Sequence, residues 1–217
     1  MRRRFGLDSG LLFYAPLTLN KNAVYAYNGI LTPLVVGDGN ISSGRLYINS
    51  NASSGFMHWD VPIQGEDITI NCYVQPTNVS SNQHNLYHGI TGNPLVSYIN
   101  LFWFRLAGQT VNVVGFHNLD YSTGITHGSN NYFVSIRKII KGAERRLIVY
   151  IDGVKKYENN ALSANVLQFN GLQKPSIGTV GYSYTGMGYY KQFSVFKDIN
   201  DDKVLELFQN NGVPKGF

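Results

Sequence analysis

The sequence predicts an all-β protein, an antiparallel two-sheet sandwich that ends in one short helix. The clearest strand is Asp67–Gln75, where apolar and polar residues alternate with a period of two. A second observation is the pair Asp152-Gly153 between the β-rich runs Arg145–Ile151 and Val154–Tyr157, because both residues tolerate a positive φ and favour a tight hairpin. The residues on the inner face of these strands are expected to be buried: Ile68, Ile70, Cys72, Val74, Leu147, Val149 and Ile151.

Further β-rich runs extend the pattern along the chain, with one helix at its end. Asn200 and the two following aspartates offer capping oxygens and negative charge for a helix that Gly212 and Pro214 end. No repeat or linker divides the chain, so we expect one domain over 11–217 after a basic arm over 1–10. The other predicted strands are Leu11–Ala15, Gly55–Val61, Val96–Leu106, Thr110–Phe116, Asn131–Ile140 and Tyr189–Lys197, and the apolar face of the helix is Val204, Leu205, Leu207 and Phe208.

The distribution of charge, the single cysteine and the short apolar runs exclude several kinds of partner, cross-link and location. Three of the five net positive charges lie in Arg2, Arg3 and Arg4, so the basic character belongs largely to one arm. A nucleic-acid-binding surface would instead spread Lys and Arg over the domain, and we expect no nucleic-acid partner. Cys72 is the only cysteine, which excludes an internal disulfide. The apolar run 11–15 is too short for a signal peptide and no stretch reaches membrane-span length, so we expect synthesis in a host cytoplasm and no membrane insertion.

The order of the segments resembles the concanavalin A-like lectin and glucanase superfamily, in its laminin G-like or pentraxin-like form. The resemblance rests on GLLFYAPLT (10–18), EDITINCYVQPTN (66–78), RRLIVYIDGVKKYENNAL (145–162) and YKQFSVFKDINDDKVLELFQNNG (190–212). The usual tryptophan of the second segment is replaced by Tyr73, and Asn131–Val134 departs from the family's W-x-h-v pattern. The resemblance implies a jelly-roll sandwich and leaves lectins, glycosidases, adhesion modules and viral or phage accessory domains open.

Sites for catalysis are not indicated. Glucanases on this fold carry paired glutamates on one strand, because retaining hydrolysis needs two carboxyl groups about 5 Å apart, and no two of the four glutamates here lie closer than fourteen positions. The segment 181–185 lacks the last glycine of a hydrolase elbow. Histidines 84, 88, 117 and 127 lack the spacing of metal ligands. The loops that hold Asp38, Asn40 and Asp120 contain too few carboxylates to favour calcium. We therefore expect no enzyme activity, no metal and no cofactor.

Binding is better supported, because glycan sites combine aromatic faces with neutral amides, and the chain holds 15 Tyr and 23 Asn. The glycine-rich stretch 179–190 gathers four tyrosines, and Trp103 is a second candidate. Core packing or a protein interface is the alternative for both clusters, and it is favoured for Trp103, since in a strand either this residue or its neighbours face the core. The candidate glycan-binding residues are Tyr182, Tyr184, Tyr189, Tyr190 and Trp103.

Two functions from different classes follow. One is a bacteriophage virion protein of capsid or tail that assembles with itself or other virion subunits, with Arg2, Arg3 and Arg4 as partner-binding residues and with surface-glycan adhesion as an added role. The alternative is a free-standing lectin-like domain. A solubilising tail without a partner is the competing interpretation of the arginines.

Overall fold

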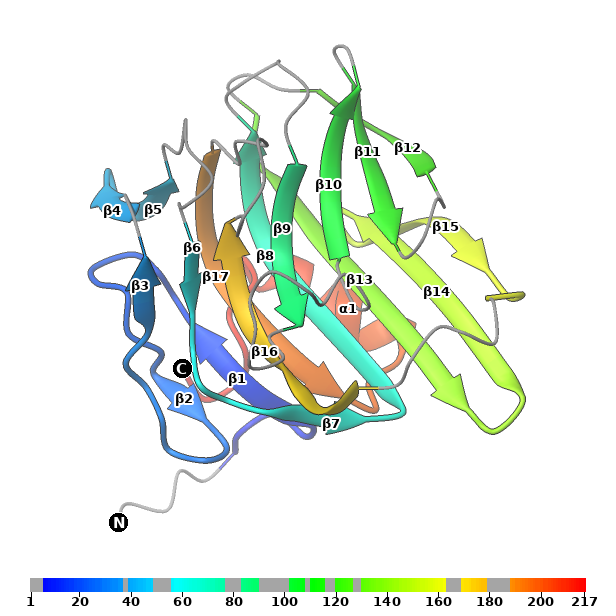
Figure 1. Cartoon of the computed structure of the whole chain (residues 1–217), viewed down its shortest axis with the longest axis horizontal. Helices are drawn as coiled ribbons and strands as arrows, with labels where there is room; N and C mark the ends of the chain where they lie inside the picture. The colour runs from blue at the N-terminus through cyan, green and yellow to red at the C-terminus, as the bar shows by residue number, and fades with distance from the viewer. Residues whose placement is uncertain are drawn as a thin grey trace.

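Two antiparallel sheets face each other, and helix α1 (Asp201–Gln209) lies on the far side of one of them (Figure 1). The computed structural model describes residues 6–36, 39–48, 56–76, 83–89, 102–107, 110–115, 120–126, 130–162, 169–178 and 188–217. The first sheet runs in the order β15 (Val154–Asn159), β14 (Glu144–Ile151), β13 (Tyr132–Lys141), β8 (Asp67–Pro76), β17 (Gly188–Lys197), β1 (Leu11–Ala15) and β2 (Tyr25–Ala26), with β5 (Arg45–Ile48) beside β17 and β4 (Gly39–Ser42) beside β5.

The second sheet supplies the other wall of the sandwich. It runs in the order β12 (Asp120–Thr126), β11 (Thr110–Gly115), β10 (Phe102–Ala107), β9 (Gln83–Gly89), β16 (Phe169–Gly178), β6 (Phe56–His58) and β3 (Leu34–Val36), with β7 (Ile63–Gly65) beside β16. The predicted antiparallel two-sheet sandwich with a short C-terminal helix is thus confirmed. The prediction missed β2, β3, β4, β5, β7, β9, β12 and β16. Residues 96–101 of the predicted strand Val96–Leu106 lie outside the described residues.

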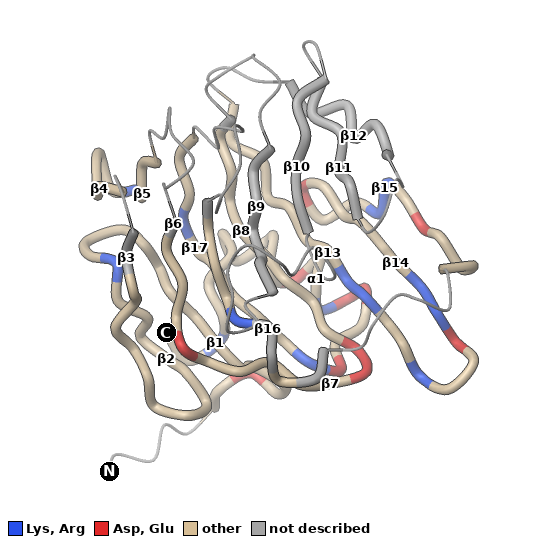
Figure 2. The backbone as a smooth tube through the Cα atoms, in the orientation of Figure 1, with Lys and Arg blue, Asp and Glu red and all other residues tan. Residues whose placement is uncertain are grey.

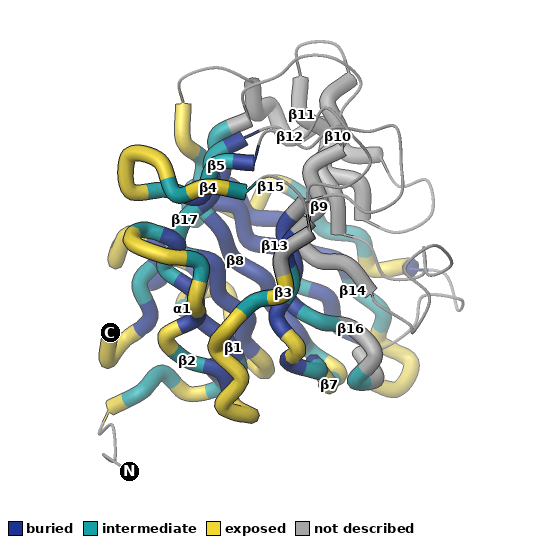
Figure 3. The backbone as a smooth tube through the Cα atoms, turned by 60° about the vertical axis from the view of Figure 1, so that its left-hand side comes forward, coloured by how far each residue is buried: buried dark blue, intermediate teal, exposed yellow. Residues whose placement is uncertain are grey.

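The core fills the space between the sheets (Figure 3). All seven side chains predicted to face inward are at most 5% exposed. Beside them Trp59 packs against Phe13 and Phe193, with ring centroids 4.9 and 5.9 Å away. Burial of each large apolar side chain stabilises the fold by about 1.5–3 kcal/mol. The Cys72 thiol lies in the same core, where burial raises its pKa, so it is held in the unreactive protonated form.

The outer face of the first sheet is covered in part by α1. The helix begins where the Asn200 side chain accepts a hydrogen bond from the Lys203 amide, an N-cap that satisfies one of the free donors of the first turn. Val204 and Leu207 are buried against the sheet. Leu205 was predicted on the same face but is 42% exposed, because it lies one residue beyond Val204 and is therefore rotated by about 100° around the helix.

The hairpin between β14 and β15 is closed by the predicted two-residue turn, with Asp152 at φ 52° and Gly153 at φ 74°. Both residues are left-handed, as a type I′ turn requires. A Cβ at position 153 would also lie 2.9 Å from Cδ1 of Phe208 on α1, so glycine is needed here for space as well as for φ. The turn and the helix therefore pack against each other.

A charged cluster fixes α1 to the sheet. The Arg137 guanidinium donates to both carboxylate oxygens of Asp67, at 2.9 and 2.6 Å, and reaches Asp201 at 3.4 Å. The Tyr150 hydroxyl donates to the same Asp201 carboxylate at 2.6 Å. Burial, followed by this hydrogen bond, raises the pKa of Tyr150. The first turn of α1 is thereby joined to β8, β13 and β14.

One cation interrupts the apolar inner face. Lys138 on β13 lies in register between Ile68 and Leu147 and is only 1% exposed. Burial lowers its pKa to about 7, because removal from water disfavours the charged ammonium.

No helix in the described ranges is long and apolar enough to cross a membrane.

Lys138 makes stability depend on pH. Its folded-state pKa of about 7 lies below the ordinary 10.5, so between these values the unfolded chain binds more protons and the free energy of unfolding rises with pH. In the wild type, the free energy of unfolding measured with urea should rise by up to about 1.4 kcal/mol per pH unit between pH 7 and 9.5. We predict that Lys138→Met removes this rise. Lys141→Gln, an exposed change on the same strand, should keep the wild-type slope. Equal slopes in wild type and Lys138→Met would contradict the assignment.

Candidate functional site

The open part of the first sheet's outer face lies over β5 and the start of β17. On β5, Leu46 and Ile48 point into the core at 0% and 2% exposure, so the alternating residues Arg45 and Tyr47 face outward and are half-buried. Residues along β17 alternate in the same way. The outward position nearest to β5 is Tyr189.

Strand register brings four polar side chains into one row across this face. Asn40 on β4 lies opposite Tyr47, Tyr47 lies opposite Tyr189, and Tyr189 lies opposite Gln75 on β8. Directly opposed residues on neighbouring strands point to the same side of a sheet. The row therefore presents the phenol rings of Tyr47 and Tyr189 between the side-chain amides of Asn40 and Gln75.

The contacts within the row are specific. The rings of Tyr47 and Tyr189 have centroids 4.6 Å apart at an interplanar angle of 30°. Cζ of Arg45 lies 4.2 Å from the centroid of the Tyr189 ring, within the range of a cation–π contact. Nη1 of Arg45 donates to Oε1 of Gln75 and, at 3.2 Å, to Oδ1 of Asn131. The arginine is thus held flat across the sheet by one ring and two amides.

A second cation lies next to the row. Nζ of Lys191 is 5.0 Å from the centroid of the Tyr73 ring, and this ring packs against Phe133 at 5.0 Å. Burial, and then the nearby Asp152 carboxylate, raise the pKa of Tyr73, so its hydroxyl stays protonated. We call the whole surface the outer-face patch, and it consists of Asn40, Arg45, Tyr47, Tyr73, Gln75, Asn131, Tyr189 and Lys191.

The structure separates the residues proposed from the tyrosine-rich stretch. Tyr189 belongs to the outer-face patch. Tyr190 is fully buried in the core, so its place among the glycan-binding candidates is corrected: adjacent strand residues face opposite sides, and only one of the two can meet a ligand. Tyr182 and Tyr184 lie outside the described residues.

For the other predicted site residues, the structure describes no side-chain position. The backbone of Trp103 lies in β10, paired with Val114 and Asn85, and its side chain is outside the described part. Arg2, Arg3 and Arg4 also lie outside the described residues. No group of three His, Cys, Asp or Glu side chains is gathered for a metal ion within the described part of the chain.

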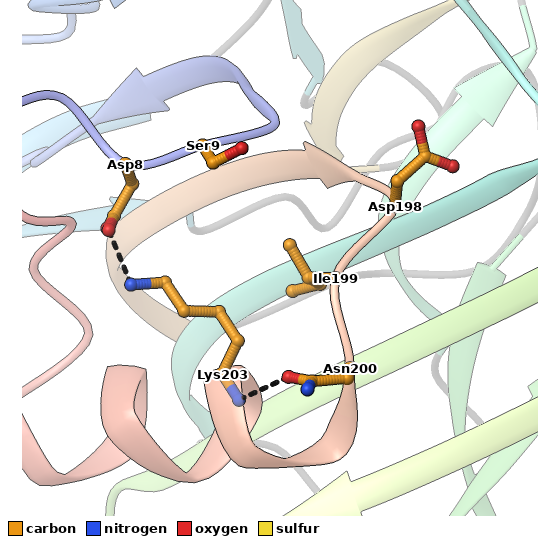
Figure 4. A pocket seen from close by; sticks show the side chains of 6 residues that line it. All are labelled: Asp8, Ser9, Asp198, Ile199, Asn200 and Lys203. Atoms are coloured by element: carbon orange, nitrogen blue, oxygen red, sulfur yellow. Dashed lines mark hydrogen bonds and ion pairs between the residues drawn. The ribbon is translucent and has the colours of Figure 1, made fainter.

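A pocket of about 320 Å³ lies where the N-terminal segment meets the start of α1 (Figure 4). Its polar groups are engaged in joining the chain: the Asp8 carboxylate accepts from Nζ of Lys203 at 2.5 Å and from the Lys215 amide at 2.6 Å. Lys203 would repel a cation, and the carboxylates of Asp8 and Asp198, which also line the pocket, would repel an anion. We interpret this pocket as a structural joint.

Tyr189 was among the candidates named from the sequence, and the residues that surround it in the outer-face patch were not. The alternation in Arg45-Leu46-Tyr47-Ile48 was the available signal, yet four residues are too few to distinguish a strand from a loop. Gln75 was predicted in a strand without a role. The contact between Tyr47 and Tyr189 joins positions 142 residues apart, and such a pairing cannot be obtained from local patterns.

The chain is similar in fold to several solved structures. A sialidase from Trypanosoma rangeli matches with a TM-score of 0.68 and 15% identity, over 93% of this chain and 33% of that one. The botulinum neurotoxin serotype G binding domain matches with a TM-score of 0.64 and 13% identity, over 93% of this chain and 51% of that one. Botulinum neurotoxin type C, described as depending on two ganglioside molecules for cell entry, matches with a TM-score of 0.62 and 11% identity, over 94% and 51%.

These identities establish similarity of fold alone. The chain spans between a third and about half of the length of these three proteins. No protein-family model and no curated protein matches the sequence.

The two neighbouring tyrosines provide a direct test of the site's register. We predict that Tyr190→Ala lowers the free energy of unfolding by about 3–5 kcal/mol, as expected when a large aromatic side chain is removed from a core. Tyr189→Ala should lower it by less than about 1 kcal/mol, because the ring is half-exposed. Urea unfolding of both variants checks this. A larger loss for Tyr189→Ala than for Tyr190→Ala would show that the faces are assigned the wrong way round.

Proposed function

We propose that this chain is a non-catalytic binding module of the concanavalin A-like superfamily and that it binds glycans through the outer-face patch. The observation that carries the proposal is the stacked pair Tyr47 and Tyr189, held on neighbouring strands with amide side chains on either side. Aromatic faces receive the apolar C–H faces of sugar rings, and neutral amides hydrogen-bond to hydroxyls. The patch offers both from strands and not from loops.

Pre-organisation supports the proposal. Arg45 fixes the Tyr189 ring from above and at the same time engages Gln75 and Asn131, so few side-chain rotations have to be frozen when a ligand binds. Ordering a flexible side chain costs about 0.5–1.5 kcal/mol on binding. A weak ligand such as a single sugar ring therefore benefits from a surface that is already ordered.

The similar structures are consistent with a glycan ligand. One is a sialidase and another is a neurotoxin described as interacting with ganglioside molecules, so two of them meet carbohydrate-bearing ligands. The sialidase is an enzyme, however, and fold does not decide function. The distinction between binding and catalysis must come from the carboxylates of this chain.

The described glutamates that approach each other do so in a structural ion pair. Glu144 and Glu158 both contact Arg146, the first at 3.1 Å, and Glu158 also accepts from Nζ of Lys155 at 2.8 Å. Lys155, followed by Arg146, lowers the pKa of Glu158. A glycosidase needs one carboxyl group with a raised pKa to act as general acid. This pair is therefore unsuited to hydrolysis.

A second candidate function, assembly into a larger particle such as a phage virion, has its own supporting observation. The segment 19–34 runs along the edge strands β2 and β3, one from each sheet, and exposes several large apolar side chains. Exposed apolar edges of this kind are typical of protein contacts. The exposed residues are Leu19, Val24, Tyr27, Ile30, Leu31 and Leu34, at 38% to 90%. We propose other copies of this chain as the partner.

Glycan binding is tested on an array with the purified protein. We predict specific signals that fall at least about fivefold for Tyr47→Ala and for Tyr189→Ala, because loss of an aromatic side chain removes about 1–3 kcal/mol of contact. Tyr27→Ala is the matched control, since this tyrosine is exposed but lies beside β2 at a different edge. Absence of any glycan signal, or equal loss in the control, would refute the proposal.

Assembly is tested by sedimentation at several salt concentrations. We predict that changing Arg2, Arg3 and Arg4 to Ala leaves the thermal midpoint nearly unchanged but weakens oligomerisation, and that raised salt mimics the loss because exposed ionic contacts are screened. Leu19→Ser combined with Leu34→Ser should weaken it independently of salt. A wild-type protein that stays monomeric at every concentration and salt would exclude this second function.

A further inference from the structure

The two cations of the outer-face patch each lie over an aromatic ring, whereas five other cations of the described residues pair with carboxylates. Arg45 lies over the Tyr189 ring and Lys191 over the Tyr73 ring, and within the described ranges neither makes an ion pair with a carboxylate. Other cations of the described sheets and helix do form such pairs: Arg137, Arg146, Lys155, Lys174 and Lys203. The patch therefore carries two positive charges that form no ion pair among the described residues, and the carboxylate that acts on the pKa of Tyr73 is that of Asp152, outside the patch.

Acidic residues are absent from the strands that form this surface. The segments Gly39–Ser42, Arg45–Ile48 and Gly188–Lys197 contain neither Asp nor Glu. The one acid of β8 is Asp67, at the opposite end of that strand and engaged by Arg137. Figure 2 shows the same separation, with blue segments on β5 and β17 and red segments gathered elsewhere on the described tube.

Among the described residues, only one side of the Arg45 guanidinium is occupied by hydrogen-bond partners. Nη1 makes both hydrogen bonds, to Gln75 and Asn131, while no hydrogen bond to a described residue uses Nε or Nη2. Nε–H and Nη2–H are parallel donors on one edge of the planar group, and this edge matches the two oxygens of a carboxylate. The contacts on Nη1 and on the Tyr189 ring fix the direction in which that edge points.

We propose that the outer-face patch takes an acidic glycan, a sugar whose carboxylate is bound by the Nε–Nη2 edge of Arg45. This inference rests on the glycan-binding function proposed above and names the ligand class of the same site. Lys191 adds a second positive charge beside the carboxylate, and the Tyr47 ring contacts the sugar.

The test compares acidic sugars with neutral counterparts, and the oligogalacturonate pair differs only in the acid group. Binding by calorimetry is measured for sialyllactose against lactose, and for oligogalacturonate against its methyl ester, with sulfated lactose as a further anion. We expect the carboxylate form of at least one pair to bind about 10- to 100-fold more tightly than its neutral counterpart, which is the range for a charge-assisted bidentate contact. The preference should decrease with salt.

Variants distinguish hydrogen bonding by the Nε–Nη2 edge of Arg45 from electrostatic attraction by a positive charge alone. Arg45→Lys keeps the charge but lacks the two parallel donors, so it should lose most of the preference for the acidic sugar over its neutral counterpart. Lys191→Gln should reduce the salt dependence. Lys141→Gln removes one positive charge from the exposed hairpin between β13 and β14 and should leave the preference unchanged.

Each outcome decides between the two proposals. Equal affinity for acidic and neutral sugars would overturn the acidic-glycan inference and leave glycan binding intact. Tighter binding of sulfated lactose than of the carboxylate sugars would overturn the inference that the Nε–Nη2 edge of Arg45 binds a carboxylate. An undiminished carboxylate preference in Arg45→Lys would overturn it as well. If no sugar of either kind binds, both the function and this inference are refuted.

Discussion

Burial of one face of β8, β17 and β5 against the opposite sheet is the constraint on which the rest of the structure depends. Side chains alternate along a strand, so a shift of one residue would exchange the two faces completely. Because Val74, Tyr190 and Leu46 must lie in the core, Gln75, Tyr189 and Tyr47 must lie outside. The geometry of the candidate site is therefore a consequence of core packing.

The outer face of the first sheet is divided between two uses. Over β13 and β14 it is covered by α1, which buries Val204 and Leu207 and is tied down by the Arg137, Asp67 and Tyr150 cluster. Over β5 and the start of β17 it remains half-exposed and carries tyrosines, amides and two cations. A short helix can cover only part of a sheet this wide, and the part it leaves open is the part with the residue types of a binding surface.

The sequence predicted the long strands β8, β13, β14 and β17, the Asp152-Gly153 hairpin and the helix, because each has a local signal such as period two over Asp67–Gln75, two turn residues that tolerate positive φ, or a capping residue ahead of an apolar face. It missed the ten-residue strand β16, where glycine and proline interrupt the pattern. Short strands such as Arg45–Ile48 lack the length for such a signal. Of the candidate glycan-binding residues, Tyr189 lies in the outer-face patch and Tyr190 lies in the core. The alignment of Tyr47 with Tyr189 depends on strand pairing between distant segments, which no local pattern contains.

The central claim is that ligand binds on the outer face, over β5, β17 and the end of β8. The most direct measurement is amide NMR of the isotopically labelled protein during titration with a glycan. The account predicts chemical-shift changes centred on residues 45–47, 73–75 and 189–191, with residues 198–203 at the helix pocket unaffected. Changes confined to the helix pocket, or to the edge segment 19–34, would contradict it.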